Sequence, residues 1–183
     1  MSDLSSDQVL AQTRAWLERA VIGLNLCPFA NGAYLKNQVR IVVSDAKHLD
    51  GFLDTLDAEI QHLRETPASV TDTTLLVHPG LFADFLVFND FLNVVDAVFE
   101  EHDAVGEFQV VAFHPEFLFE GEAPDDMSHY TNRSPFPMLH LLREDSLSQA
   151  IDAYGDTDAI PLRNQRVLRE LGLTRWQALL SDK

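Results

Sequence analysis

Positive charge and cysteine are both scarce in this sequence. The chain of 183 residues has one cysteine, Cys27, so no disulfide can form within it. It carries 13 basic residues against 29 acidic ones, which gives a formal net charge of −16. Nucleic acids and anionic membrane surfaces attract clusters of Lys and Arg. We therefore expect neither a nucleic acid nor a membrane as a partner.

Long apolar runs and familiar cofactor motifs are also lacking. The longest uncharged stretch, residues 20–35, is interrupted by glycine, asparagine and proline, which excludes a membrane span there. The first residues lack the basic start and apolar core of a signal peptide, so we expect a cytoplasmic protein. Neither a glycine-rich phosphate loop nor a G-x-S-x-G elbow occurs. We expect no cofactor.

The composition is that of a globular protein. Hydrophobic residues make up 46% of the chain. A chain of this length favours one domain, here residues 1–183, and can bury a core without disulfides or a structural metal.

Hydrophobic periodicity predicts alternating strands and helices. The first helix should begin near Ser5, because Ser5 and Gln8 have capping-box spacing. Strands are predicted at residues 39–43, 73–77, 108–113 and 138–143, with helices between the first three. This order predicts an α/β fold with a mixed sheet of about four strands built on β-α-β-α-β, and helices packed on it. The first three strands should be parallel, and a short helical tail should end the chain.

Two histidines end predicted strands and precede proline, in LLV-His78-Pro79 and VAF-His114-Pro115. If the strands are parallel, both imidazoles lie at the carboxyl edge of the sheet, where open α/β sheets bind ligands. Histidine can act there as an acid, a base or a metal ligand. The alternative is that each ring simply bonds a loop carbonyl where its strand ends.

The segment from His114 to Pro137 fits no helix or strand. It runs 24 residues with four prolines, and loops this long are usually functional or disordered. Its aromatic residues argue for an ordered loop. We expect it to cross the carboxyl edge of the sheet.

Arg133 is the only lysine or arginine in residues 65–142. Its planar fork suits a carboxylate or phosphate, and Asn132 and Ser134 add hydrogen-bonding capacity. The alternative is an ion pair that pins the loop, with a nearby acid: Asp125, Asp126 or Glu116.

Cys27 follows a predicted helix C-terminus, where the helix dipole disfavours a thiolate, so it is expected to pack as a small hydrophobe unless a histidine approaches it. His140, within the fourth strand, is expected to be a core residue. These two and the two strand-ending histidines could together bind zinc or iron. Because no two of them have a metal-type spacing, we predict no bound metal.

Arg163, Arg166 and Arg169 recur every three residues on a predicted helix. The favoured interpretation is a solvated face that pairs with the acidic body of the protein. The alternative is a patch for an anionic ligand or an acidic partner.

Several stretches resemble one known family. They are GLNLCPFA at residues 23–30, FHP at 113–115, and NRSPFP at 132–137 running on to LHLLRE at 139–144. Together they resemble an uncharacterised family, domain of unknown function 1415, whose members have about this length. The resemblance implies no reaction, cofactor or fold.

These observations favour a small-molecule enzyme or ligand-binding protein with an anion-accepting site at the carboxyl edge of the sheet. His114 would be the acid–base group, while Arg133, Asn132 and Ser134 would hold a small anionic ligand. His78 and Cys27 are further candidates. One alternative is a metal-binding protein with His and Cys ligands. The other is a non-enzymatic adaptor that binds a partner protein through the arginine face or the acidic surface.

Overall fold

A computed structural model describes residues 4–181 of the chain. The elements in chain order are α1 (Ser6–Trp16), the π-helix η1 (Leu17–Ile22), α2 (Ala30–Leu35), β1 (Val39–Val43), α3 (Leu49–Glu65), β2 (Thr73–Val77), α4 (Phe85–Glu101), β3 (Phe108–Phe113), the 3₁₀-helix η2 (Met127–Thr131), β4 (Met138–Arg143), α5 (Glu144–Tyr154) and α6 (Ala159–Leu180). None of the helices in this part of the chain has the length and apolar content needed to cross a membrane.

The four strands form one mixed sheet in the order β1-β2-β4-β3. β1 pairs in parallel with β2, while β4 is antiparallel to both β2 and β3. β1, β2 and β3 therefore run in the same direction, which confirms the sequence prediction. β4 lies between β2 and β3, so its start meets their carboxyl ends.

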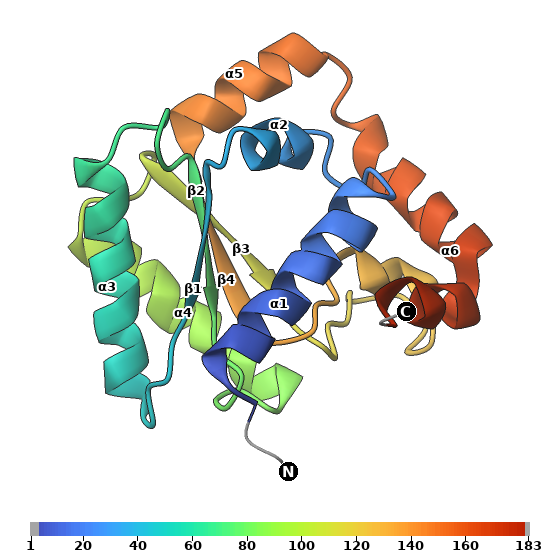
Figure 1. The fold of residues 1–183 in the computed structure, drawn as a ribbon, viewed down its shortest axis with the longest axis horizontal. Coiled ribbons are helices and arrows are strands. Elements are labelled where there is room, and N and C mark those ends of the chain that lie inside the picture. Colours follow the sequence, from blue (N-terminus) through green and yellow to red (C-terminus); the bar gives the residue numbers. More distant parts are fainter. Residues whose placement is uncertain (1–3, 182–183) are drawn as a thin grey trace.

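Helices cover both faces of this sheet (Figure 1). The core on one face joins Leu76, Leu139 and Leu141 to side chains of α3 and α4. The core on the other face joins Leu75 and Met138 to side chains of α1, η1 and α6. β2 is buried at all five positions, because β1 and β4 flank it and helices cover both faces of the sheet.

The two ends of the chain fold largely as the sequence predicts. Ser5 and Gln8 form the expected capping box at the start of α1. The C-terminal part is longer than the short tail we expected, because α6 spans 22 residues. α6 consists of two helical stretches that meet at a kink at Gly172, whose φ of 71° and ψ of 163° are not helical.

Candidate functional site

Both ring nitrogens of His78, and both of His114, form hydrogen bonds with backbone groups. His78 Nε2 donates to the carbonyl of Ala46 at 2.9 Å, and its Nδ1 accepts the amides of Gly80 and Leu81 at 3.1 and 2.7 Å. Nδ1 must accept these bonds, so Nε2 carries the proton. Burial lowers the pKa of His78, so the ring is neutral at pH 7.

His114 repeats this arrangement on β3. Its Nε2 donates to the carbonyl of Phe82 at 2.7 Å, and its Nδ1 accepts the amide of Glu116 at 3.0 Å. The ring is 1% exposed and stacks on Phe88 of α4 at a centroid distance of 5.3 Å. In this conformation neither nitrogen is available to a substrate.

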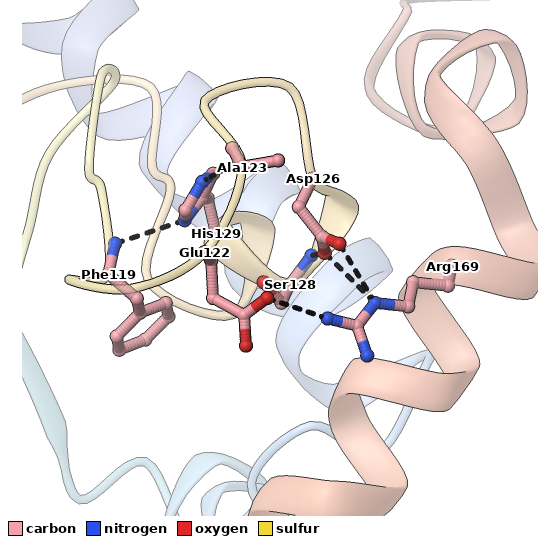
Figure 2. A network of polar contacts seen from close by, with 7 residues as sticks. All are labelled: Phe119, Glu122, Ala123, Asp126, Ser128, His129 and Arg169. Atoms are coloured by element: carbon pink, nitrogen blue, oxygen red, sulfur yellow. Dashed lines mark hydrogen bonds and ion pairs between the residues drawn. The ribbon is translucent and has the colours of Figure 1, made fainter.

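The long loop after β3 is ordered by Arg169 and by His129, a loop residue that sequence reasoning did not single out (Figure 2). His129 is fully buried, accepts the amide of Phe119 at 3.0 Å and donates to the carbonyl of Ala123 at 2.7 Å. Arg169 of α6 binds Asp126 and Glu122 at 3.0 Å each. The loop is thus tied to the C-terminal helix, and the favoured interpretation of this arginine, pairing with the acidic body, is observed.

Arg133 does not form the ion pair with loop acids that was the alternative. Its Nε donates to the carbonyl of Phe117 at 3.1 Å, and its guanidinium lies 4.5 Å from the centroid of the Tyr130 ring. Among residues 4–181, no hydrogen bond or ion pair engages its two terminal nitrogens. Asp126, one of the expected partners, pairs with Arg169 instead.

These free nitrogens belong to a side chain that lines a pocket of about 400 Å³, here named the Arg133 pocket. Its walls include Trp16 of α1, Trp176 of α6, Tyr130, Pro115 and Ser134. Since Pro115 follows His114 at the end of β3, the pocket adjoins the carboxyl edge of the sheet. The described residues that line it include no carboxylate.

A second cavity, of about 420 Å³, lies against the sheet face that α1 and η1 cover, here named the His140 cavity. His140 of β4, Asn132 and Cys27 line it, and α2 and α5 contribute further walls. The thiol and an imidazole therefore share one cavity. Sequence reasoning placed each of them but could not show that they meet.

Cys27 and His140 are both neutral in this cavity. Burial raises the pKa of the Cys27 thiol, although the backbone amides of Phe29 and Ala30 act in the opposite direction. Those amides open α2, so the thiol stands before a helix start as well as after the end of η1. Burial lowers the pKa of His140 to about 4. The two shifts oppose a thiolate–imidazolium pair between Cys27 and His140.

The predicted site residues thus separate into three places. Arg133 and Ser134 line the Arg133 pocket, Asn132 and Cys27 line the His140 cavity, and neither lining includes His78 or His114. The expected convergence of His114 with Arg133 in one pocket is not observed. Within residues 4–181, no group of three or more His, Cys, Asp or Glu side chains is arranged to hold a metal ion.

Sequence reasoning missed the aromatic walls of the Arg133 pocket. Trp16 packs in the core and is 2% exposed. It also donates from Nε1 to the carbonyl of Arg133 at 3.1 Å, a contact across 117 residues of sequence. No local pattern signals such a contact.

A model of the family described as a protein of unknown function, DUF1415, matches residues 8–178. Neither the curated proteins nor the solved structures that were compared gave a match. The stretches that carry the resemblance lie around the two pockets. Residues 26, 27, 29, 30, 113, 132, 140, 142 and 143 line the His140 cavity, and residues 115, 133, 134 and 135 line the Arg133 pocket.

Proposed function

The chain belongs to this DUF1415 family of unknown function, and we propose that it binds a small anionic molecule in the Arg133 pocket. The observation that carries the proposal is the state of Arg133. Within residues 4–181, no partner engages its two terminal nitrogens and no carboxylate lines its pocket, on a protein of net charge −16.

The geometry of Arg133 suits an anion. The bond from Nε to the carbonyl of Phe117 and the Tyr130 ring beneath the guanidinium fix the orientation of its plane. A fixed guanidinium fork binds a carboxylate or phosphate through two parallel hydrogen bonds, with less loss of side-chain entropy than a mobile one.

The walls favour an anion that has an apolar or aromatic body. Trp176 packs edge-on against Tyr130 at a centroid distance of 5.1 Å, and Trp16 forms another wall. Ser134 donates its hydroxyl proton to the carbonyl of Phe136 at 2.7 Å, so toward a ligand it can only accept. Arg133 is therefore the group that would hold the negative charge.

The proposal ends at binding and assigns no proton transfer. His114 lies outside the pocket lining, and its ring nitrogens are engaged by Phe82 and Glu116. Ligand binding is accordingly the function that the site supports best.

Intrinsic fluorescence tests this proposal directly, because the chain has two tryptophans and both line the pocket. We expect phenyl phosphate and benzoate to change the emission in a saturable way, and benzyl alcohol, which is neutral, to have little effect. In Arg133→Met the dissociation constant of phenyl phosphate should rise by about 10–100-fold, the loss expected for charge-assisted hydrogen bonds.

Two variants serve as controls. Arg133→Lys keeps the charge without the fork and should bind with intermediate affinity. Arg166→Met removes the same charge from an exposed position on α6 that lies outside the pocket lining, and should bind like the wild type. The proposal fails if none of the anions binds, or if Arg133→Met and the wild type bind them equally.

A further inference from the structure

The His140 cavity is separate from the Arg133 pocket. It lies on the α1-side face of the sheet, where Thr73, Leu75 and Phe113 line it. Of the residues that line the two spaces, only Trp16 is common to both. A volume of about 420 Å³ is within the range of small-molecule sites.

The hydrogen bonds of Thr73 determine which nitrogen of His140 carries the proton. Thr73 Oγ1 donates to the carbonyl of Leu141 at 2.6 Å, and it lies 2.6 Å from His140 Nε2. A hydroxyl has one proton to donate, and here it is donated in the hydrogen bond to the Leu141 carbonyl. Thr73 must therefore accept from His140, so Nε2 is protonated and Nδ1 is a bare acceptor.

His140 Nδ1 has no hydrogen-bond partner among residues 4–181. Burial lowers the pKa of this ring to about 4, so it stays neutral at pH 7 and offers a lone pair, not a positive charge. A carboxylate or phosphate would be repelled by such a lone pair. A neutral N–H or O–H group would be bound by it.

Asn132 supplies a second acceptor to the same cavity. Its Nδ2 donates to the carbonyl of Ala112 at 3.0 Å, which orients the amide and leaves Oδ1 without a partner in the described chain. Most of the remaining lining is apolar, although the charged side chains of Lys36, Asp72 and Arg143 also line the cavity. The cavity thus combines oriented acceptors with walls that are mostly apolar.

We propose that the His140 cavity binds a neutral, mainly apolar small molecule that donates a hydrogen bond from N–H or O–H to His140 Nδ1. The preference for a donor follows from the Thr73 hydroxyl, which fixes the tautomer. This ligand differs in charge from the one proposed for the Arg133 pocket, so the two sites can be tested separately.

Cys27 offers a readout of occupancy, because it lines the cavity and is the only cysteine of the chain. The rate of its alkylation by N-ethylmaleimide would be followed by mass spectrometry in the presence of indole or of benzofuran. The two probes have nearly the same shape, but only indole carries an N–H group. Indole should protect Cys27 with an apparent affinity at least about fivefold higher, as one hydrogen bond requires.

In His140→Phe the aromatic ring remains but the acceptor is lost. Indole and benzofuran should therefore protect Cys27 of this variant equally. Arg133→Met should leave the protection by indole unchanged. Nitrogen-15 NMR of the wild type adds a test that needs no variant. The free protein should show the Nε2–H tautomer, and indole, but not benzofuran, should shift the Nδ1 resonance of His140. Equal protection by the two probes, no protection by either, or an Nδ1–H tautomer would overturn the proposal.

Discussion

His78, His114 and His129 have the same hydrogen-bonding role in three different places. Each accepts a nearby backbone amide at Nδ1 and donates to a backbone carbonyl from Nε2. In the first two, the accepted amide lies two residues after the histidine, beyond the intervening proline. The rings of His78 and His114 close loops at the carboxyl edge of the sheet. His140 differs from them because its Nδ1 is left free.

His140 should make the stability of the protein depend on pH. Its folded pKa is about 4, whereas an unfolded histidine titrates near 6.5. Between these values the unfolded chain binds a proton that the folded protein does not. The free energy of unfolding should therefore fall as the pH falls from 6.5 to 4, by up to about 1.4 kcal/mol per pH unit from this residue.

Urea unfolding of the wild type and of His140→Phe at pH 7, 6, 5 and 4.5 measures this contribution. Phenylalanine keeps a ring of similar size in a mostly apolar setting, so the variant should fold and show a shallower decline below pH 6.5. Parallel curves for the two proteins would show that the proton uptake belongs to other groups, such as His78, whose pKa is also lowered by burial.

At the scale of elements, one ion pair joins the first strand to α3. Arg40 of β1 binds Glu59 at 2.8 and 3.1 Å through two parallel hydrogen bonds. The side chain of Glu59 is 6% exposed and that of Arg40 is 42% exposed. Removing the arginine would leave a buried carboxylate without its counter-charge, whereas removing both charges would not.

We therefore expect Arg40→Met to lower the free energy of unfolding by about 2 kcal/mol, less than for a fully buried pair because Arg40 is partly hydrated. The double variant Arg40→Met/Glu59→Met should recover part of this loss. Arg166→Met, at an exposed position, should change stability by less than about 0.5 kcal/mol. Chemical denaturation measures all three, and a double variant less stable than Arg40→Met would contradict the argument.

Strands and helices were predictable where local periodicity determines them. The ranges 39–43, 73–77, 108–113 and 138–143 match the strands of the structure. The site was less predictable, since its contacts join distant residues. The acceptor of His114 lies 32 residues away, and the carbonyl of Arg133 is bonded by Trp16. Arg133 and Ser134 could be predicted to line a binding pocket, because the sequence itself shows that Arg133 is a single basic residue within a long acidic loop.

At the scale of the whole molecule, the net charge of −16 should destabilise the folded state through repulsion. Asp96, Glu100 and Glu101 illustrate this on α4, where all three are exposed and two lie at the negative end of the helix dipole. Salt screens such repulsion over about 10 Å at 0.1 M.

Raising NaCl from 0.02 to about 0.3 M, across the range where screening changes most, should therefore increase the melting temperature measured by circular dichroism. The triple variant Asp96→Asn/Glu100→Gln/Glu101→Gln should melt higher than the wild type at low salt and gain less from added NaCl. A melting temperature that falls with salt would mean that attractive pairs, such as Arg169 with Asp126, outweigh the repulsion.

The position of β4 has a consequence for how the chain folds as it is synthesised. β2 and β3 leave the ribosome before residues 138–143, yet these two strands pair with β4 and not with each other. Until β4 arrives, each presents an open edge with unsatisfied backbone groups, the kind of surface on which strands of different chains associate. Translation of the last strand is thus the step that closes the sheet, and a nascent chain stalled before residue 138 is the form most exposed to aggregation.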